Sequence, residues 1–126
     1  MRLLLDTHVL LWLMDDSPSL SADARAIIDN ADEVYVSAAS VWELAIKVRA
    51  NKLRLELDDI EDQIASAGFE ELPVRSAHAL GVAQLPLHHA DPFDRILIAQ
   101  AAHEPLRLLT VDKALAPYGE MILMAQ

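Results

Sequence analysis

The stretch "RLLLD", Arg2 to Asp6, is an unbroken apolar run that ends in an acid. A strand of a parallel sheet that is covered on both faces has this pattern, because neither of its faces meets water. Ligands of open parallel sheets bind outside the carboxyl ends of the strands. The stretch therefore predicts a buried first strand, with Asp6 at a place where a ligand can reach it.

Segments typical of strands and helices alternate along the rest of the chain. Ser21 is the expected N-cap of the second helix, and Ser40 is the expected N-cap of the third, with Glu43 at its capping-box position. The alternation predicts one α/β domain over residues 1–126, with a mainly parallel sheet of about four to five strands flanked by helices. After the first strand, the strands are expected at "EVYVS" (33–37), "FEELPV" (69–74), "LRLLTVD" (106–112) and "MILMA" (121–125).

Composition narrows the class of protein. No apolar run approaches the roughly 18 residues that cross a bilayer, the N-terminus lacks the pattern of a signal peptide, and the chain has no cysteine. We therefore expect a cytoplasmic protein without membrane contact. The net charge of -10 argues against a surface that attracts nucleic acid everywhere. Lys47 and Arg49 nevertheless begin a local basic patch one turn from Glu43 that could guide a phosphate backbone inward, although such residues are more often a solvated helix end.

Four acids are predicted to meet at one edge of the sheet. Asp6 and Asp112 follow apolar strands, while Glu43 and Asp94 stand near the starts of helices. Strand ends and the beginnings of the following helices share that edge in an α/β domain. Clustered carboxylates repel one another and raise each other's pKa unless a cation neutralises them. Hard oxygen ligands favour Mg²⁺, with Mn²⁺ as a possible substitute.

Each of these acids also has an ordinary structural interpretation. Asp91 precedes Pro92, so Asp91 can be an N-cap with proline at the first helical position and Asp94 at the third. Glu43 can be a capping-box residue, and Asp112 a turn residue. His88 and His89 suggest zinc, but adjacent residues rarely bind one ion together. The four acids as a set indicate chemistry more strongly than any one of them.

Four segments in order, "LLLDTH", "SAASVWELAIK", "DPFDRILIAQA" and "LLTVD", resemble the PIN-domain family, and specifically the toxin ribonucleases of VapBC-type toxin–antitoxin pairs. The resemblance implies a Mg²⁺-dependent endoribonuclease that hydrolyses RNA phosphodiester bonds with metal-activated water. It also implies a homodimer, inhibited by a cognate antitoxin whose tail covers the site. By resemblance, the metal-binding and catalytic roles belong to Asp6, Glu43, Asp94 and Asp112, with Thr110 as a supporting hydroxyl and Asp91 as an additional acid.

Two other functions stay open. A metal-dependent phosphatase of the haloacid dehalogenase type also begins from an aspartate after the first strand, but it needs a second aspartate where this chain has His8. A non-catalytic PIN-like module that only holds RNA or a protein is the second alternative, and the presence of all four acids argues against it.

The apolar helix after Asp6, which carries Trp12 and Met14, is expected to contact the core and to contribute to a dimer or antitoxin interface.

Overall fold

A five-stranded, entirely parallel sheet forms the centre of the computed structural model, which describes residues 1–125. The strand order is β3-β2-β1-β4-β5, with β1 in the middle. In register, Leu4 of β1 lies opposite Tyr35 of β2 and Leu108 of β4. The predicted α/β architecture is confirmed. The strands are β1 (Arg2–Leu5), β2 (Glu33–Ser37), β3 (Glu70–Leu72), β4 (Arg107–Thr110) and β5 (Ile122–Met124).

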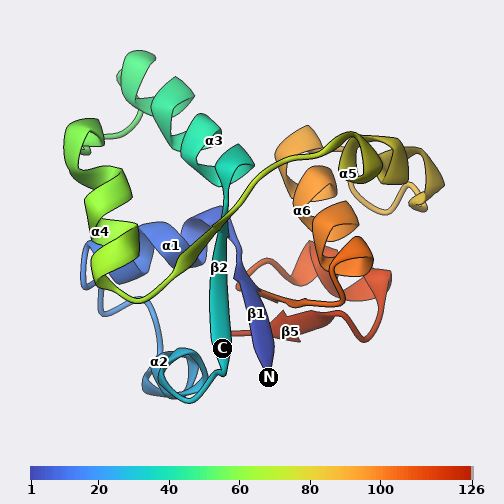
Figure 1. The fold of residues 1–126 in the computed structure, drawn as a ribbon, viewed down its shortest axis with the longest axis horizontal. Helices are drawn as coiled ribbons and strands as arrows, with labels where there is room; N and C mark the ends of the chain where they lie inside the picture. Colours follow the sequence, from blue (N-terminus) through green and yellow to red (C-terminus); the bar gives the residue numbers. More distant parts are fainter. Residues whose placement is uncertain (126) are drawn as a thin grey trace.

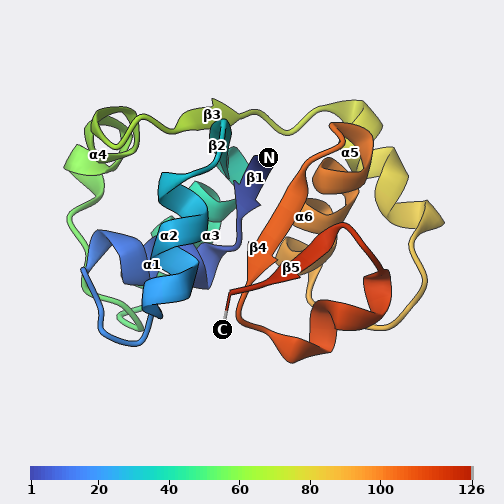
Figure 2. The ribbon, with the colours of Figure 1, turned by 90° about the horizontal axis from the view of Figure 1, so that it is seen from below.

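Helices cover the sheet from both sides. In Figures 1 and 2, α1, α2 and α4 lie on one side of the sheet and α5 and α6 on the other, while α3 extends beyond the carboxyl end of β2. The α-helices are α1 (Thr7–Met14), α2 (Ala22–Asp29), α3 (Ala38–Arg49), α4 (Ile60–Ser66), α5 (Ser76–Gly81) and α6 (Pro92–His103). Short 3-10 helices occupy Leu57–Asp59 (η1), Val82–Gln84 (η2) and Lys113–Tyr118 (η3).

The first strand is buried on both faces, as its sequence predicts. Leu3 and Leu5 belong to the core cluster that includes residues of α1, α2 and α4, whereas Leu4 belongs to the cluster that includes α6. All three side chains are fully buried. Because successive side chains of a strand point to opposite faces, the continuous "LLL" run supplies both cores at once.

The N-terminus of α3 differs from the sequence-based expectation. Ser37 is the N-cap, and its Oγ atom accepts a hydrogen bond of 3.0 Å from the backbone N–H of Ala39. The prediction that Ser40 caps this helix, with Glu43 in a capping box, is wrong. β2 continues into α3 without a loop, so the cap falls on the last residue of the strand. Ser40 is buried in the first turn, where its Oγ accepts a 2.9 Å hydrogen bond from the Thr7 hydroxyl.

The predicted cap of the second helix is confirmed, and the third strand is shorter than predicted. Ser21 caps α2, with its side chain accepting from the backbone N–H of Ala24. The third strand covers only residues 70–72, at the edge of the sheet, and Pro73, which has no backbone N–H to donate, follows directly after it. Gly68, with φ of +81°, reverses the chain after α4 as expected of a helix-ending glycine.

The apolar helix α1 packs on the core. Val9 and Leu10 are buried, and Trp12 and Met14 are partly buried against the same core cluster. A role of α1 in an interface stays a prediction.

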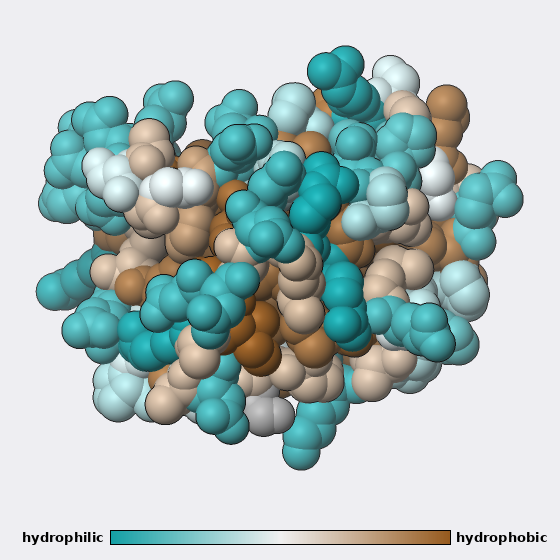
Figure 3. Space-filling model, turned by 60° about the horizontal axis from the view of Figure 1, so that its bottom comes forward, coloured by the Kyte–Doolittle hydropathy of each residue, from teal (hydrophilic) through white to brown (hydrophobic). Residues whose placement is uncertain are grey.

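No helix in residues 1–125 is both long and apolar enough to cross a membrane. Hydrophilic residues cover much of the face shown in Figure 3, with hydrophobic residues between them.

Candidate metal centre

The order in which strands are added to the sheet reverses between β1 and β4, which makes this a topological switch point. From β1 the chain adds β2 and β3 on one side, and β4 and β5 lie on the other side. Asp6 directly follows β1, and Asp112 follows β4 after one intervening residue. In open α/β sheets, this switch point at the carboxyl edge is the usual place for a ligand.

Asp6 is a buried carboxylate held by two donors. It caps α1 by accepting a 3.2 Å hydrogen bond from the backbone N–H of His8, and it also accepts one from the hydroxyl of Thr110. Burial raises the pKa of Asp6, the two hydrogen bonds oppose that rise, and the nearby charge of Glu43 adds to it. An ionised Asp6 is therefore stabilised by its donors but still lacks a full counter-charge.

Glu43 projects from α3 with one paired oxygen and one unpaired oxygen. Its Oε2 accepts from the Lys47 ammonium at 3.0 Å. Its Oε1 is buried and, within residues 1–125, has no hydrogen-bond partner. A buried carboxylate oxygen without a donor is costly, and a cation would compensate that cost.

Asp94 has the clearest electrostatic strain in the centre. It lies in the first turn of α6, and burial together with repulsion from Asp6 raises its pKa to about 6. A 2.7 Å contact between the Asp94 Oδ2 and the His89 Nε2 partly opposes this rise. Asp91 adds further repulsion.

Asp91 is the N-cap of α6, as its position before Pro92 predicts. Its Oδ1 accepts hydrogen bonds of 2.9 Å and 3.0 Å from the backbone N–H groups of Phe93 and Asp94. This cap fixes the first turn of the helix and therefore the position of Asp94. The cap and the additional negative charge thus occur in the same residue.

Asp112 completes the group from the β4 side. It caps η3 by accepting from the backbone N–H of Ala114 at 2.9 Å. One ligand atom each from Asp112, Asp94 and His89 lie within 4.8 Å of one another. Thr110 is fully buried between the acids, and its hydroxyl also accepts the backbone N–H of Asp112 at 3.0 Å.

The structure brings ligand atoms of Asp94 and Asp112 within reach of one ion, and it places Asp6 and Glu43 near enough that the charge of Asp6 raises the pKa of Asp94 and the charge of Glu43 raises that of Asp6. The predicted basic residues Lys47 and Arg49 lie in the last turn of α3, the helix that carries Glu43. Lys47 pairs with Glu43, whereas Arg49 is exposed in the last turn of α3. Three observations fit a divalent cation: the unpaired oxygen of Glu43, the raised pKa of Asp94 and the burial of Asp6. An all-carboxylate set of this kind suits Mg²⁺ or Mn²⁺.

Two residues of this region were not predicted from the sequence. In the sequence His89 stands beside His88 as one of two possible zinc ligands, whereas the structure brings His89 alone to the acids. Arg95 is buried, and its guanidinium donates to four backbone carbonyl groups in residues 82–89 and to the Tyr118 hydroxyl. The available signal was an arginine inside the otherwise apolar run of α6, which needs partners when it is buried.

A second group of possible ligands does not fit a cation. His78, His103 and Glu104 also lie close together. The Nδ1 atom of His78 accepts the backbone N–H of Arg75 at 3.0 Å, so the proton of a neutral ring is on Nε2, which donates to Glu104 at 2.7 Å. Both nitrogens are therefore used, and His78 is a buried histidine whose hydrogen bonds are satisfied.

Fold and site together define a class: a single parallel α/β domain with an acidic candidate metal centre at its switch point. Comparison with known proteins identifies the family within this class. Residues 3–120 match the model of the PIN domain. The chain is 31% identical over 118 residues to Ribonuclease VapC22 of Mycobacterium tuberculosis, covering 89% of this chain and 88% of that protein. The chain belongs to the PIN-domain family.

Solved structures share the same fold. The VapBC2 structure from Rickettsia felis, bound to a DNA fragment from its promoter, contains a chain that aligns with a TM-score of 0.73 at 14% identity, with coverage of 98% of this chain and 97% of that one. A DNA-bound VapBC from Salmonella typhimurium gives a TM-score of 0.70 at 16% identity, with coverage of 100% and 99%. At such low identity these likenesses establish the fold.

Proposed function

We propose that this protein is a Mg²⁺-dependent endoribonuclease and the toxin of a toxin–antitoxin pair. The observation that carries the proposal is the convergence of Asp6, Glu43, Asp94 and Asp112 at the switch point of a PIN domain. The relative from Mycobacterium tuberculosis is named a ribonuclease, and related folds occur in VapBC complexes. The named relative and the structural neighbours both support the proposal of a toxin ribonuclease.

Asp6 and Asp94 are the proposed direct ligands, while Glu43 and Asp112 hold or orient water or a second ion. A bound divalent cation supplies positive charge beside a scissile phosphate and lowers the pKa of water. Mn²⁺ is a possible substitute for Mg²⁺. Around the ligands, Thr110 orients Asp6 through its hydroxyl, and the Asp91 cap fixes Asp94 at the start of α6.

Lys47 and Arg49 are proposed to contact the RNA backbone. Lys47 already neutralises one oxygen of Glu43, so its ammonium lies at the edge of the acidic group. Arg49 is on the same helix and exposed. Two cations here can attract phosphates locally although the whole chain carries a net charge of -10.

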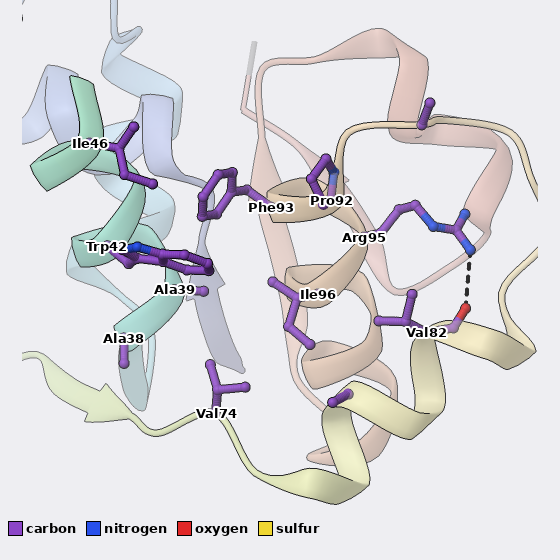
Figure 4. Close-up of a pocket in the computed structure, with 12 residues that line it drawn as sticks. Ala38, Ala39, Trp42, Ile46, Val74, Val82, Pro92, Phe93, Arg95 and Ile96 are labelled. Atoms are coloured by element: carbon purple, nitrogen blue, oxygen red, sulfur yellow. Dashed lines mark hydrogen bonds between the residues drawn. The ribbon is translucent and has the colours of Figure 1, made fainter. Parts of the chain in front are cut away.

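We propose that the protein forms a homodimer and that the groove between α3 and α6 is the surface through which the two copies contact each other. The groove holds about 900 Å³ and is lined almost entirely by apolar residues. Figure 4 shows Trp42 and Ile46 of α3 facing Phe93 and Ile96 of α6 across it. Trp42 is 63% exposed, and its ring lies edge-on to Phe93 with centroids 5.0 Å apart. Two copies of an acidic chain repel one another, so a surface without acids is the suitable one for self-association.

We propose that the antitoxin binds through charge and not through the apolar groove. A basic segment of an antitoxin would be attracted by the acidic surface and by the carboxylates of the candidate metal centre. Such a segment would cover the site and exclude RNA. Affinity that does not depend on salt concentration would argue against this mode of binding.

The direct test is cleavage of pooled tRNA and mRNA by the purified protein with Mg²⁺. We expect the wild type to cleave and both Asp6→Asn and Asp94→Asn to be inactive yet folded, whereas the exposed control Asp58→Asn should keep full activity. Full activity of either site variant, or of the wild type in excess chelator, would contradict the proposal. RNA binding without cleavage would favour the non-catalytic alternative, and hydrolysis of a generic phosphomonoester but not of RNA would favour the phosphatase.

A further inference from the structure

We propose that the imidazole of His89 is a direct ligand of the cation at this centre, which makes the centre a mixed nitrogen and oxygen site. The inference rests on the proposed metal-dependent function. It adds a ligand outside the four acids, on the segment that precedes α6.

The geometry of the contact carries the inference. The Nε2 of His89 lies 2.7 Å from the Oδ2 of Asp94, and one ligand atom of Asp112 lies within 4.8 Å of both residues' ligand atoms. Neighbouring ligand atoms around an octahedral ion with bonds near 2.1 Å are about 3 Å apart. The His89 and Asp94 atoms are thus already near the spacing that one ion requires. The two side chains are 23% and 19% exposed, so solvent and ions reach them.

The backbone of His89 is anchored on both sides of its Cα atom. Its N–H donates to the Tyr118 hydroxyl at 3.0 Å, and its carbonyl accepts from the Arg95 Nη1 at 3.3 Å. Tyr118 in turn donates to the carbonyl of Pro86 at 3.0 Å. A ligand whose backbone is fixed in advance loses little conformational freedom when an ion binds.

His88 provides a natural comparison within the same segment. Its ring packs edge-on against Tyr118, with centroids 5.1 Å apart, instead of approaching the acids. The two adjacent histidines therefore have different environments, in agreement with the expectation that they do not bind one ion together. A change at His88 alters the same loop without altering the proposed ligand set.

An imidazole changes which ion the centre prefers. Mg²⁺ binds oxygen almost exclusively, whereas imidazole nitrogen suits transition metals. With His89 as a ligand, the ratio of Mn²⁺ to Mg²⁺ affinity should be higher than in a site of carboxylates alone. If His89 instead only donates its Nε2–H to Asp94, it is a positioning residue and the ratio should not depend on its nitrogen.

The test is electron spin echo spectroscopy on Mn²⁺-loaded full-length protein, which detects nitrogen bonded to the ion. We expect a ¹⁴N coupling in the wild type and in His88→Gln, and its loss in His89→Gln, which keeps an N–H donor for Asp94. Calorimetric titration should show that His89→Gln binds Mn²⁺ about tenfold more weakly, with a smaller change for Mg²⁺. Circular dichroism would verify that the variants are folded.

The outcomes separate this inference from the proposed function. Mn²⁺ binding without ¹⁴N coupling in the wild type, or a coupling that persists in His89→Gln, overturns the inference and leaves the carboxylate centre in place. Failure of the wild type to bind Mn²⁺ or Mg²⁺ at all overturns both.

Discussion

The hydroxyl of Thr110 donates a hydrogen bond to the Oδ2 of Asp6 and accepts the backbone N–H of Asp112. The link joins the ends of two neighbouring strands, since β1 and β4 pair in parallel and the Asp6 N–H donates to the Leu109 carbonyl at 2.9 Å. A single buried side chain thereby holds two of the four acids in fixed relative positions.

Thr110→Val removes this hydroxyl with little change in shape. The Asp6 carboxylate and the Asp112 N–H each lose a buried partner, so we expect unfolding to need about 2 kcal/mol less free energy. The loss of a donor should also raise the pKa of Asp6 and weaken cation binding. Urea denaturation and Mg²⁺ titration measure both effects. Thr110→Ser, which keeps the hydroxyl, is the control, and an unchanged cation affinity in the valine variant would contradict the role given to Thr110.

Asp94→Asn should stabilise the metal-free protein at neutral pH. The pKa of Asp94 is about 6 in the folded protein, against an ordinary value of 3.8. The folded state therefore binds more protons between these values, and stability falls as pH rises through that window. Allowing for its partial exposure, we expect the variant to be about 2 kcal/mol more stable at pH 7.5 in chelator.

The stability difference between Asp94→Asn and the wild type should disappear below about pH 4, where the wild-type carboxyl is protonated in both states. Adding Mg²⁺ should stabilise the wild type and not the variant. Thermal denaturation at several pH values tests this, and a variant that is less stable than the metal-free wild type at every pH would refute the assigned strain.

Arg95→Met should destabilise the loop that carries His89. The guanidinium donates to the carbonyls of Val82 and Pro86, both at 3.0 Å, and methionine leaves these buried groups without a donor (Figure 4 shows the Val82 bond). We expect a loss of about 3 kcal/mol in the free energy of unfolding, measured in urea. Arg95→Lys should fall between, because one ammonium cannot reach all the acceptors. The exposed Arg54→Met should change stability by less than about 0.5 kcal/mol.

Trp42→Glu should convert the proposed dimer to a monomer without unfolding it. The indole is 63% exposed beside the groove, so the core loses little, while two buried glutamates would face one another in the dimer. Light scattering coupled to gel filtration gives the mass. Leu87→Glu adds the same charge at an exposed position outside the groove lining and should stay dimeric. If Trp12→Glu gave the monomer and Trp42→Glu did not, the interface would lie on α1.

Local patterns predicted most of the fold because they act over short distances along the chain. The "LLL" run requires cover on both faces, which only a central parallel strand receives, and Asp91 before Pro92 specifies the start of α6. The cap of α3 was misassigned because Ser37 and Ser40 are equally good caps in isolation. The absence of a loop after β2 decided between them.

Sequence patterns alone predicted the strand and helix order, the parallel sheet, the positions of Asp6 and Asp112 after their strands and the position of Asp94 in the first turn of α6. The assembled fold was needed to establish that His89, and not His88, contacts the acids, that Arg95 holds the loop, and that one oxygen of Glu43 is buried without a donor among residues 1–125. Periodicity and capping depend on neighbours a few residues away. Side-chain direction and desolvation depend on packing between segments that are distant in the chain, and so they emerge only when the sheet and its helices are assembled.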